Sequence, residues 1–156
     1  GIRKNLLEYD QVNNEQREII YKERRRVLDG DNMRDAICKM ITDTVENTVD
    51  MCISDEVDSD EWDLIELNTI LQPIIPVKTI TKEDVEGIRK NQLKQNLKEE
   101  AIKLYEVKEA EFAEPEQIRE LERVVLLKVI DRKWMDHIDD MEQLRQGIGL
   151  QAYGQR

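Results

Sequence analysis

The stretch PEQIRELERVVLLKVIDRKWMDHIDDMEQLRQ, residues 115–146, decides the fold class. Its apolar residues recur at intervals of three and four, which is the period of one face of an α-helix. Pro115 suits the first turn of a helix, and Gly147 follows as a stop signal. We therefore expect a helix about 48 Å long, at ~1.5 Å per residue, whose seam lies along another long helix. That seam consists of Leu127, Ile130, Trp134, His137, Met141 and Leu144.

A second long helix is predicted at the start of the chain, over residues 2–28. Its apolar residues follow at helical spacing, and Asp29-Gly30-Asp31 supplies the stop. Gly30 is suited to the left-handed conformation that often follows a helix. No capping residue precedes Ile2, so we expect this helix to be cut from a longer one.

The middle of the chain predicts shorter elements. Asp31 or Asn32 can cap a helix, and the acidic segment SDEVDSD (54–60) follows it as a linker without a core. The predicted stripe of that helix is Met33, Ile37, Met40 or Ile41, Val45, Thr48 and Cys52. Asp60 is then expected to cap a short helix that includes Trp62, Ile65 and Leu71.

Two further signals complete the expected fold. Pro73 and Pro76 predict an extended segment, because a residue before proline avoids helical angles. The sequence TKED (81–84) resembles a capping box that opens a long helix towards Phe112. The sequence thus predicts an all-α fold, in which long helices bracket a small helical lobe.

Composition excludes several classes of protein. The chain has 156 residues, 38% charged and 39% hydrophobic, with six glycines and three prolines, which argues against a β-sandwich or a disulfide scaffold. No apolar run approaches the ~18–20 residues that a membrane-spanning helix needs. The net charge is −11, and residues 31–80 contribute −9 from 3 basic and 12 acidic side chains. So acidic a chain would repel nucleic acid.

The sequence contains no self-contained catalytic or metal site. It lacks the phosphate-binding patterns GxGxxG and GxxxxGK followed by Ser or Thr, so no cofactor is expected in this chain. Its one histidine, His137, cannot build a multi-histidine metal site and lies on the predicted seam. We interpret it as a packing residue; the alternative is a small helical enzyme with His137 as general base. Cys38 and Cys52 have no disulfide or metal-ligand pattern, which favours small hydrophobic roles in a reducing setting.

Three features can be interpreted in more than one way. The basic run at 24–26 indicates either a solvated face near a helix C-terminus or a contact for a carboxylate or an anionic lipid. Trp62 and Trp134 are expected to anchor cores. Residues 147–156, GIGLQAYGQR, are predicted to form a loop, where Tyr153 has either an interaction role or none.

Two long stretches resemble SecA, the ATP-driven motor family of bacterial preprotein translocation. RKNLLEYDQVNNEQREIIYKERRRVLDG (3–30) is similar to the start of the family's helical scaffold domain. KVIDRKWMDHIDDMEQLRQGIGLQAYGQ (128–155) is similar to the first helix and tip loop of its two-helix finger. The resemblance implies scaffold over 1–51 and 115–156, and a helical wing domain over 52–114.

The resemblance also implies roles for residues. The finger loop of Leu150, Gln151 and Tyr153 would contact the translocating preprotein, although Gln151 stands where the family loop commonly carries a basic residue. The finger helix would pack against the motor and restrain its ATPase activity. That helix face consists of Trp134, His137, Met141, Leu144 and Arg145.

The resemblance further implies a setting for the whole protein. Its nucleotide-binding domains would lie outside this chain and bind ATP and magnesium. Its partners would be the SecYEG channel, preproteins, anionic phospholipid and a second copy in a homodimer. It would be cytoplasmic and peripherally associated with the inner face of the bacterial membrane. The other class that the sequence leaves open is a free-standing helical adaptor without ATPase activity.

Overall fold

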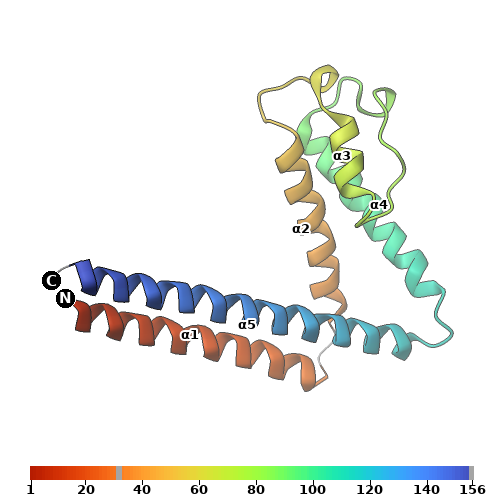
Figure 1. The fold of residues 1–156 in the computed structure, drawn as a ribbon. Helices are drawn as coiled ribbons and strands as arrows, with labels where there is room; N and C mark the ends of the chain where they lie inside the picture. Colours follow the sequence, from red (N-terminus) through yellow and green to blue (C-terminus); the bar gives the residue numbers. More distant parts are fainter. Residues whose placement is uncertain (31–32, 155–156) are drawn as a thin grey trace. The chain divides into compact units, whose positions relative to one another are not determined.

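The structure is a computed structural model that describes residues 1–30 and 33–154. It confirms the all-α prediction: every regular element in these ranges is a helix (Figure 1). The chain divides into two compact units. Unit 1 comprises Gly1–Met33 and Arg119–Arg156, and unit 2 comprises Arg34–Ile118.

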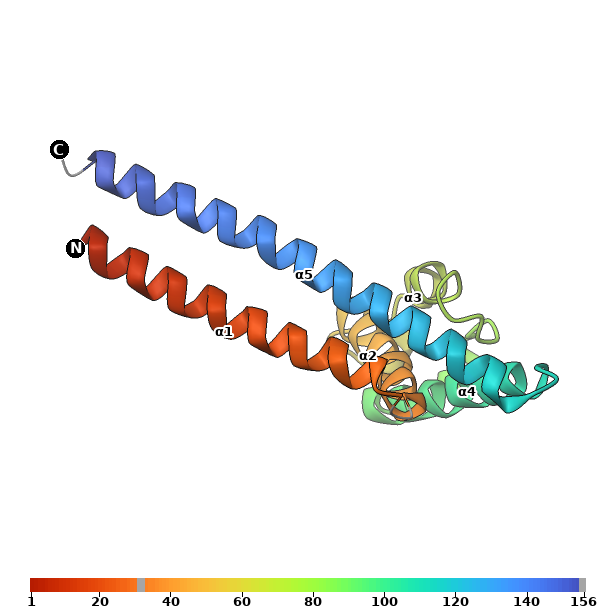
Figure 2. The same cartoon turned by 90° about the horizontal axis from the view of Figure 1, so that it is seen from below.

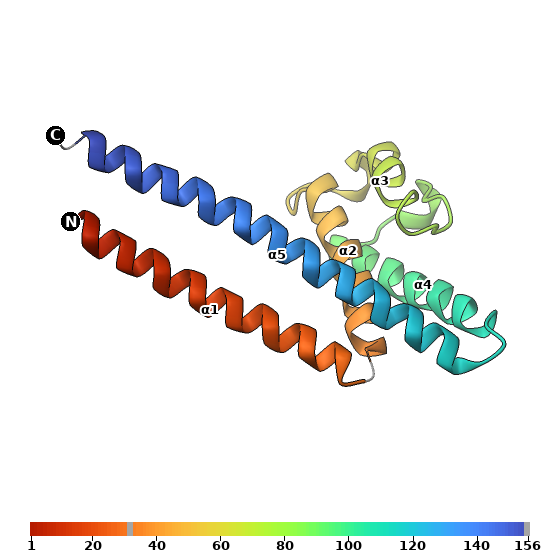
Figure 3. The ribbon, with the colours of Figure 1, turned by 60° about the horizontal axis from the view of Figure 1, so that its bottom comes forward.

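Unit 1 consists mainly of two long helices, α1 (Ile2–Leu28) and α5 (Pro115–Gly154). They lie side by side and antiparallel over most of their length (Figures 2 and 3). The predicted end of α1 is confirmed, because Gly30 has a φ of +90° and its N–H donates to the Val27 carbonyl at 3.2 Å. Glycine adopts this left-handed conformation without the steric cost that a Cβ brings.

The predicted loop at residues 147–156 is wrong as far as Gly154, because α5 continues as helix through Gly147 and Gly149. Glycine lowers helix propensity by about 1 kcal/mol but does not forbid helical angles. No proline follows to stop the helix, and Ile148 is buried two turns beyond Met141. This burial favours continued helix. The side chains of Leu150, Gln151 and Tyr153 lie outside the described residues.

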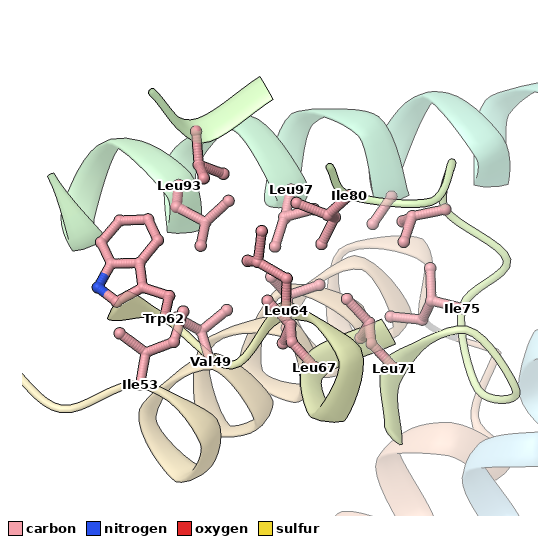
Figure 4. Close-up of a cluster of buried hydrophobic side chains, with 14 residues drawn as sticks. Val49, Ile53, Trp62, Leu64, Leu67, Leu71, Ile75, Ile80, Leu93 and Leu97 are labelled. Carbon is pink, nitrogen blue, oxygen red and sulfur yellow. The ribbon is translucent and has the colours of Figure 1, made fainter. Parts of the chain in front are cut away.

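Unit 2 is built around α2 (Arg34–Cys52), α3 (Leu64–Leu71) and α4 (Lys90–Ala110). Both α3 and α4 pack against α2. The core runs from Trp62, Ile53 and Leu93 at one end to Leu71 and Ile75 at the other (Figure 4). Four of its side chains are completely inaccessible to solvent: Val45, Val49, Leu67 and Leu71. The prediction that Val45 and Thr48 face the core is therefore confirmed.

Two predicted helix starts in unit 2 are wrong. The short helix α3 is capped by Asp63, whose Oδ1 accepts from the Glu66 N–H at 3.0 Å, and not by Asp60. Asp60 lies instead in a short 3₁₀ helix, η1 (Ser59–Glu61). Trp62, between these two helices, is buried as predicted, and its indole N–H donates to the Val57 carbonyl at 2.9 Å.

The second wrong start concerns α4, which begins at Lys90 and not at residue 81. Asp84 closes the expected turn, since its Oδ2 accepts from both the N–H and the hydroxyl of Thr81 at 2.9 Å. The turn produces only the 3₁₀ helix η2 (Glu83–Val85). Gly87 then has a φ of +72°, which interrupts the helix before α4 begins.

Compact unit 2 is larger than the lobe predicted over residues 52–114. The reason is α2, which buries its apolar face against α3 and α4 and so belongs with them. The assignment of 1–51, 52–114 and 115–156 to scaffold, wing and scaffold stays a prediction.

Candidate functional site

Two of the residues that the sequence singles out on α5, Trp134 and His137, lie on the face that meets α1. His137 Nε2 is 3.2 Å from Asn13 Oδ1, a hydrogen bond in which the imidazole N–H donates. The His137 and Trp134 rings are 5.5 Å apart, tilted by 34°. The guanidinium carbon of Arg17 lies 5.8 Å from the centre of the Trp134 ring, within cation–π range. Trp134 is only half-buried, so it contributes to the contact between α1 and α5 and is not enclosed in a core as expected.

This geometry supports the interpretation of His137 as a packing residue. A general base needs a proton-bearing substrate group or nucleophile within hydrogen-bonding reach. Here the imidazole binds an amide oxygen of the neighbouring helix and stacks near an indole. Both contacts involve the meeting faces of α1 and α5, and neither activates a nucleophile.

The remainder of the predicted seam is confirmed only in part. Ile130 and Met141 are buried, whereas Leu144 is 49% exposed. Arg145, which the resemblance adds to this helix face, is exposed. Two helices alone bury one narrow stripe, and Leu144 lies at its margin. The stripe continues to Ile148, for which the sequence predicted a loop.

The polar partners on α1 were not predicted from the sequence. Asn13 and Arg17 are one turn apart, and Arg24 lies further along the same helix. Arg24 forms a salt bridge with Asp131 of α5, so one member of the basic run at 24–26 makes a contact between the two helices. The four-residue spacing of Tyr9, Asn13 and Arg17 places them on one face of a helix, but it does not indicate that this face meets α5.

Apolar side chains are also exposed along the α1–α5 pair. Those with 38–63% exposure are Leu6, Leu7, Val12, Ile19, Tyr21, Leu28, Leu121, Val124, Val125, Met135, Ile138 and Leu144. Single exposed apolar residues are normal on proteins, but a large number on two paired helices indicates surface available for contact. The pair can therefore serve as a platform on which other segments pack.

Unit 2 carries a different surface. A groove of about 1320 Å³ lies between the segment at residues 55–62 and the segment at 82–91. On one of its walls, hydrogen bonds from Lys94 and Lys90 hold the pKa of Asp50 below its ordinary value. The hydrogen bond from Lys90 to Asp55 raises the pKa of Lys90. Within the described residues, no group of three or more His, Cys, Asp or Glu side chains is arranged to hold a metal ion.

The two units also differ in charge. Unit 1 has 14 basic and 14 acidic residues and is neutral, while unit 2 has 10 basic and 21 acidic residues and carries −11. None of the described helices is long and apolar enough to cross a membrane. A helix pair of zero net charge with exposed apolar side chains, joined to an acidic helical unit, is typical of a helical scaffold.

Comparison with known proteins gives this scaffold a family. The SecA wing and scaffold domain model matches residues 1–156, and the chain belongs to that family. It is 68% identical, over 158 aligned residues, to the protein translocase subunit SecA of Lachnoclostridium phytofermentans. It is 49% identical to the SecA of Syntrophomonas wolfei and 46% identical to that of Finegoldia magna. All of this chain is covered in each alignment, and it spans about 17–19% of the length of these relatives.

Proposed function

We propose that this chain is the wing and scaffold portion of a SecA-type motor that drives preproteins through the SecYEG channel. The observation that carries the proposal is the family match over the whole chain, together with the 68% identity to a protein translocase subunit. The same comparisons give no support to a free-standing helical adaptor.

In this proposal α5 transmits nucleotide-driven movement to its own far end. A continuous helix of 40 residues suits that task, because its backbone hydrogen bonds make it stiff along its axis. Contacts of His137, Trp134 and Asp131 with α1 brace it over part of its length. The residues at its end, Leu150, Gln151 and Tyr153, would contact the moving polypeptide.

The exposed apolar faces of α1 and α5 support a second part of the proposal. They would be covered by other domains of the longer protein, among them the nucleotide-binding domains that hold ATP and magnesium. The face from Trp134 to Arg145 would restrain the ATPase. We further propose a cytoplasmic location with peripheral association to the inner membrane face, contacts with anionic phospholipid, and a homodimeric parent protein.

The test is a chimera in which residues 1–156 replace the matching segment of the Lachnoclostridium phytofermentans SecA. We expect ATP-dependent transport of a preprotein into SecYEG vesicles at a rate close to that of the unaltered relative. A chimera that folds, binds and hydrolyses ATP but moves no preprotein would contradict the proposal. The unaltered relative and a chimera without ATP are the controls.

The role of the α5 end is tested in the same chimera by Tyr153→Ala and Tyr153→Phe. We expect the alanine variant to lower transport more than nucleotide binding, because it removes the aromatic ring. Phenylalanine, which keeps the ring, should retain transport. Equal transport by all three chimeras would count against a preprotein contact at Tyr153.

A further inference from the structure

We draw no further inference here: the strongest candidate, the groove of unit 2 between residues 55–62 and 82–91, is lined by an acidic cluster and the N-terminus of α4, and no second observation within the described residues points to a ligand that it would hold.

Discussion

Replacing Leu67 with alanine should destabilise unit 2 strongly, and the structure gives the expected magnitude. Leu67 is on α3 and is completely inaccessible to solvent within the core of unit 2. The substitution removes three carbon atoms, worth about 2.4 kcal/mol at ~0.8 kcal/mol per buried methylene. The cavity left behind adds to this loss, so we expect about 3–4 kcal/mol in the free energy of unfolding.

Ile65→Ala is the matched control for this prediction. Ile65 is on the same short helix but is 81% exposed, so its removal costs little buried area. Alanine also has the higher helix propensity, by a few tenths of a kcal/mol. We therefore expect Ile65→Ala to be neutral or slightly stabilising.

Urea unfolding followed by Trp62 fluorescence is the assay. Trp62 is buried in the same core, and a Trp134→Phe background removes the signal of the other tryptophan. The reasoning would be refuted if the two alanine variants unfolded with equal free energies. In that case the burial of α3 would not contribute to the stability of unit 2.

Three further predictions follow from single features of the backbone and of the titratable groups. Gly87→Ala should destabilise unit 2 by about 1–2 kcal/mol, because Gly87 has a positive φ that a residue with a Cβ disfavours. Gly147→Ala should stabilise α5 by about 0.5–1 kcal/mol, because Gly147 is helical and a Cβ there meets no other atom. Thermal unfolding of both variants tests this pair of predictions. The hydrogen bond from Lys94 lowers the pKa of Asp50, so this carboxylate stabilises the fold above its ordinary pKa and loses that effect as pH falls through the lowered value. In urea titrations from pH 7 to 3, the free energy of unfolding should therefore decrease less in Lys94→Gln than in the unaltered chain. Burial raises the pKa of Cys52, so its neutral thiol favours the folded state, and this contribution to stability decreases as pH rises above the ordinary thiol pKa. The test is the alkylation rate of Cys52 against pH in a Cys38→Ala chain. The rate should reach half its maximum at a higher pH in the folded protein than in urea.

Local sequence signals predicted helix ends correctly only where the buried apolar pattern agreed with them. Gly30 was interpreted correctly because the glycine coincides with the end of the apolar stripe of α1. Gly147 was misread because the same residue type lies inside a helix whose burial resumes at Ile148. A glycine therefore marks a helix end only when the apolar pattern also stops there.

The site on α5 was predicted from one helix alone, and this limited what could be found. Apolar periodicity located Trp134, His137 and Met141 correctly, since all three lie on one helical face. It could not identify Asn13 or Arg17, because hydrophobic patterns ignore polar side chains that face a partner helix. The burial of Leu144 was overestimated, because an apolar pattern does not indicate how wide the buried stripe of a helix is. The roles of Leu150, Gln151 and Tyr153 stay predictions.

The separation of charge between the units suggests two different kinds of contact. Unit 1 is neutral and exposes apolar side chains on both of its long helices, so its contacts gain mainly from burial of apolar area and depend weakly on salt. Unit 2 carries the entire net charge of −11, so its contacts are subject to screening over about 10 Å at 0.1 M ionic strength. In the motor that we propose, the helix pair is therefore suited to permanent packing against neighbouring domains. The acidic unit is suited to contacts that form and release, because screened charges hold partners less tightly than buried apolar surface does.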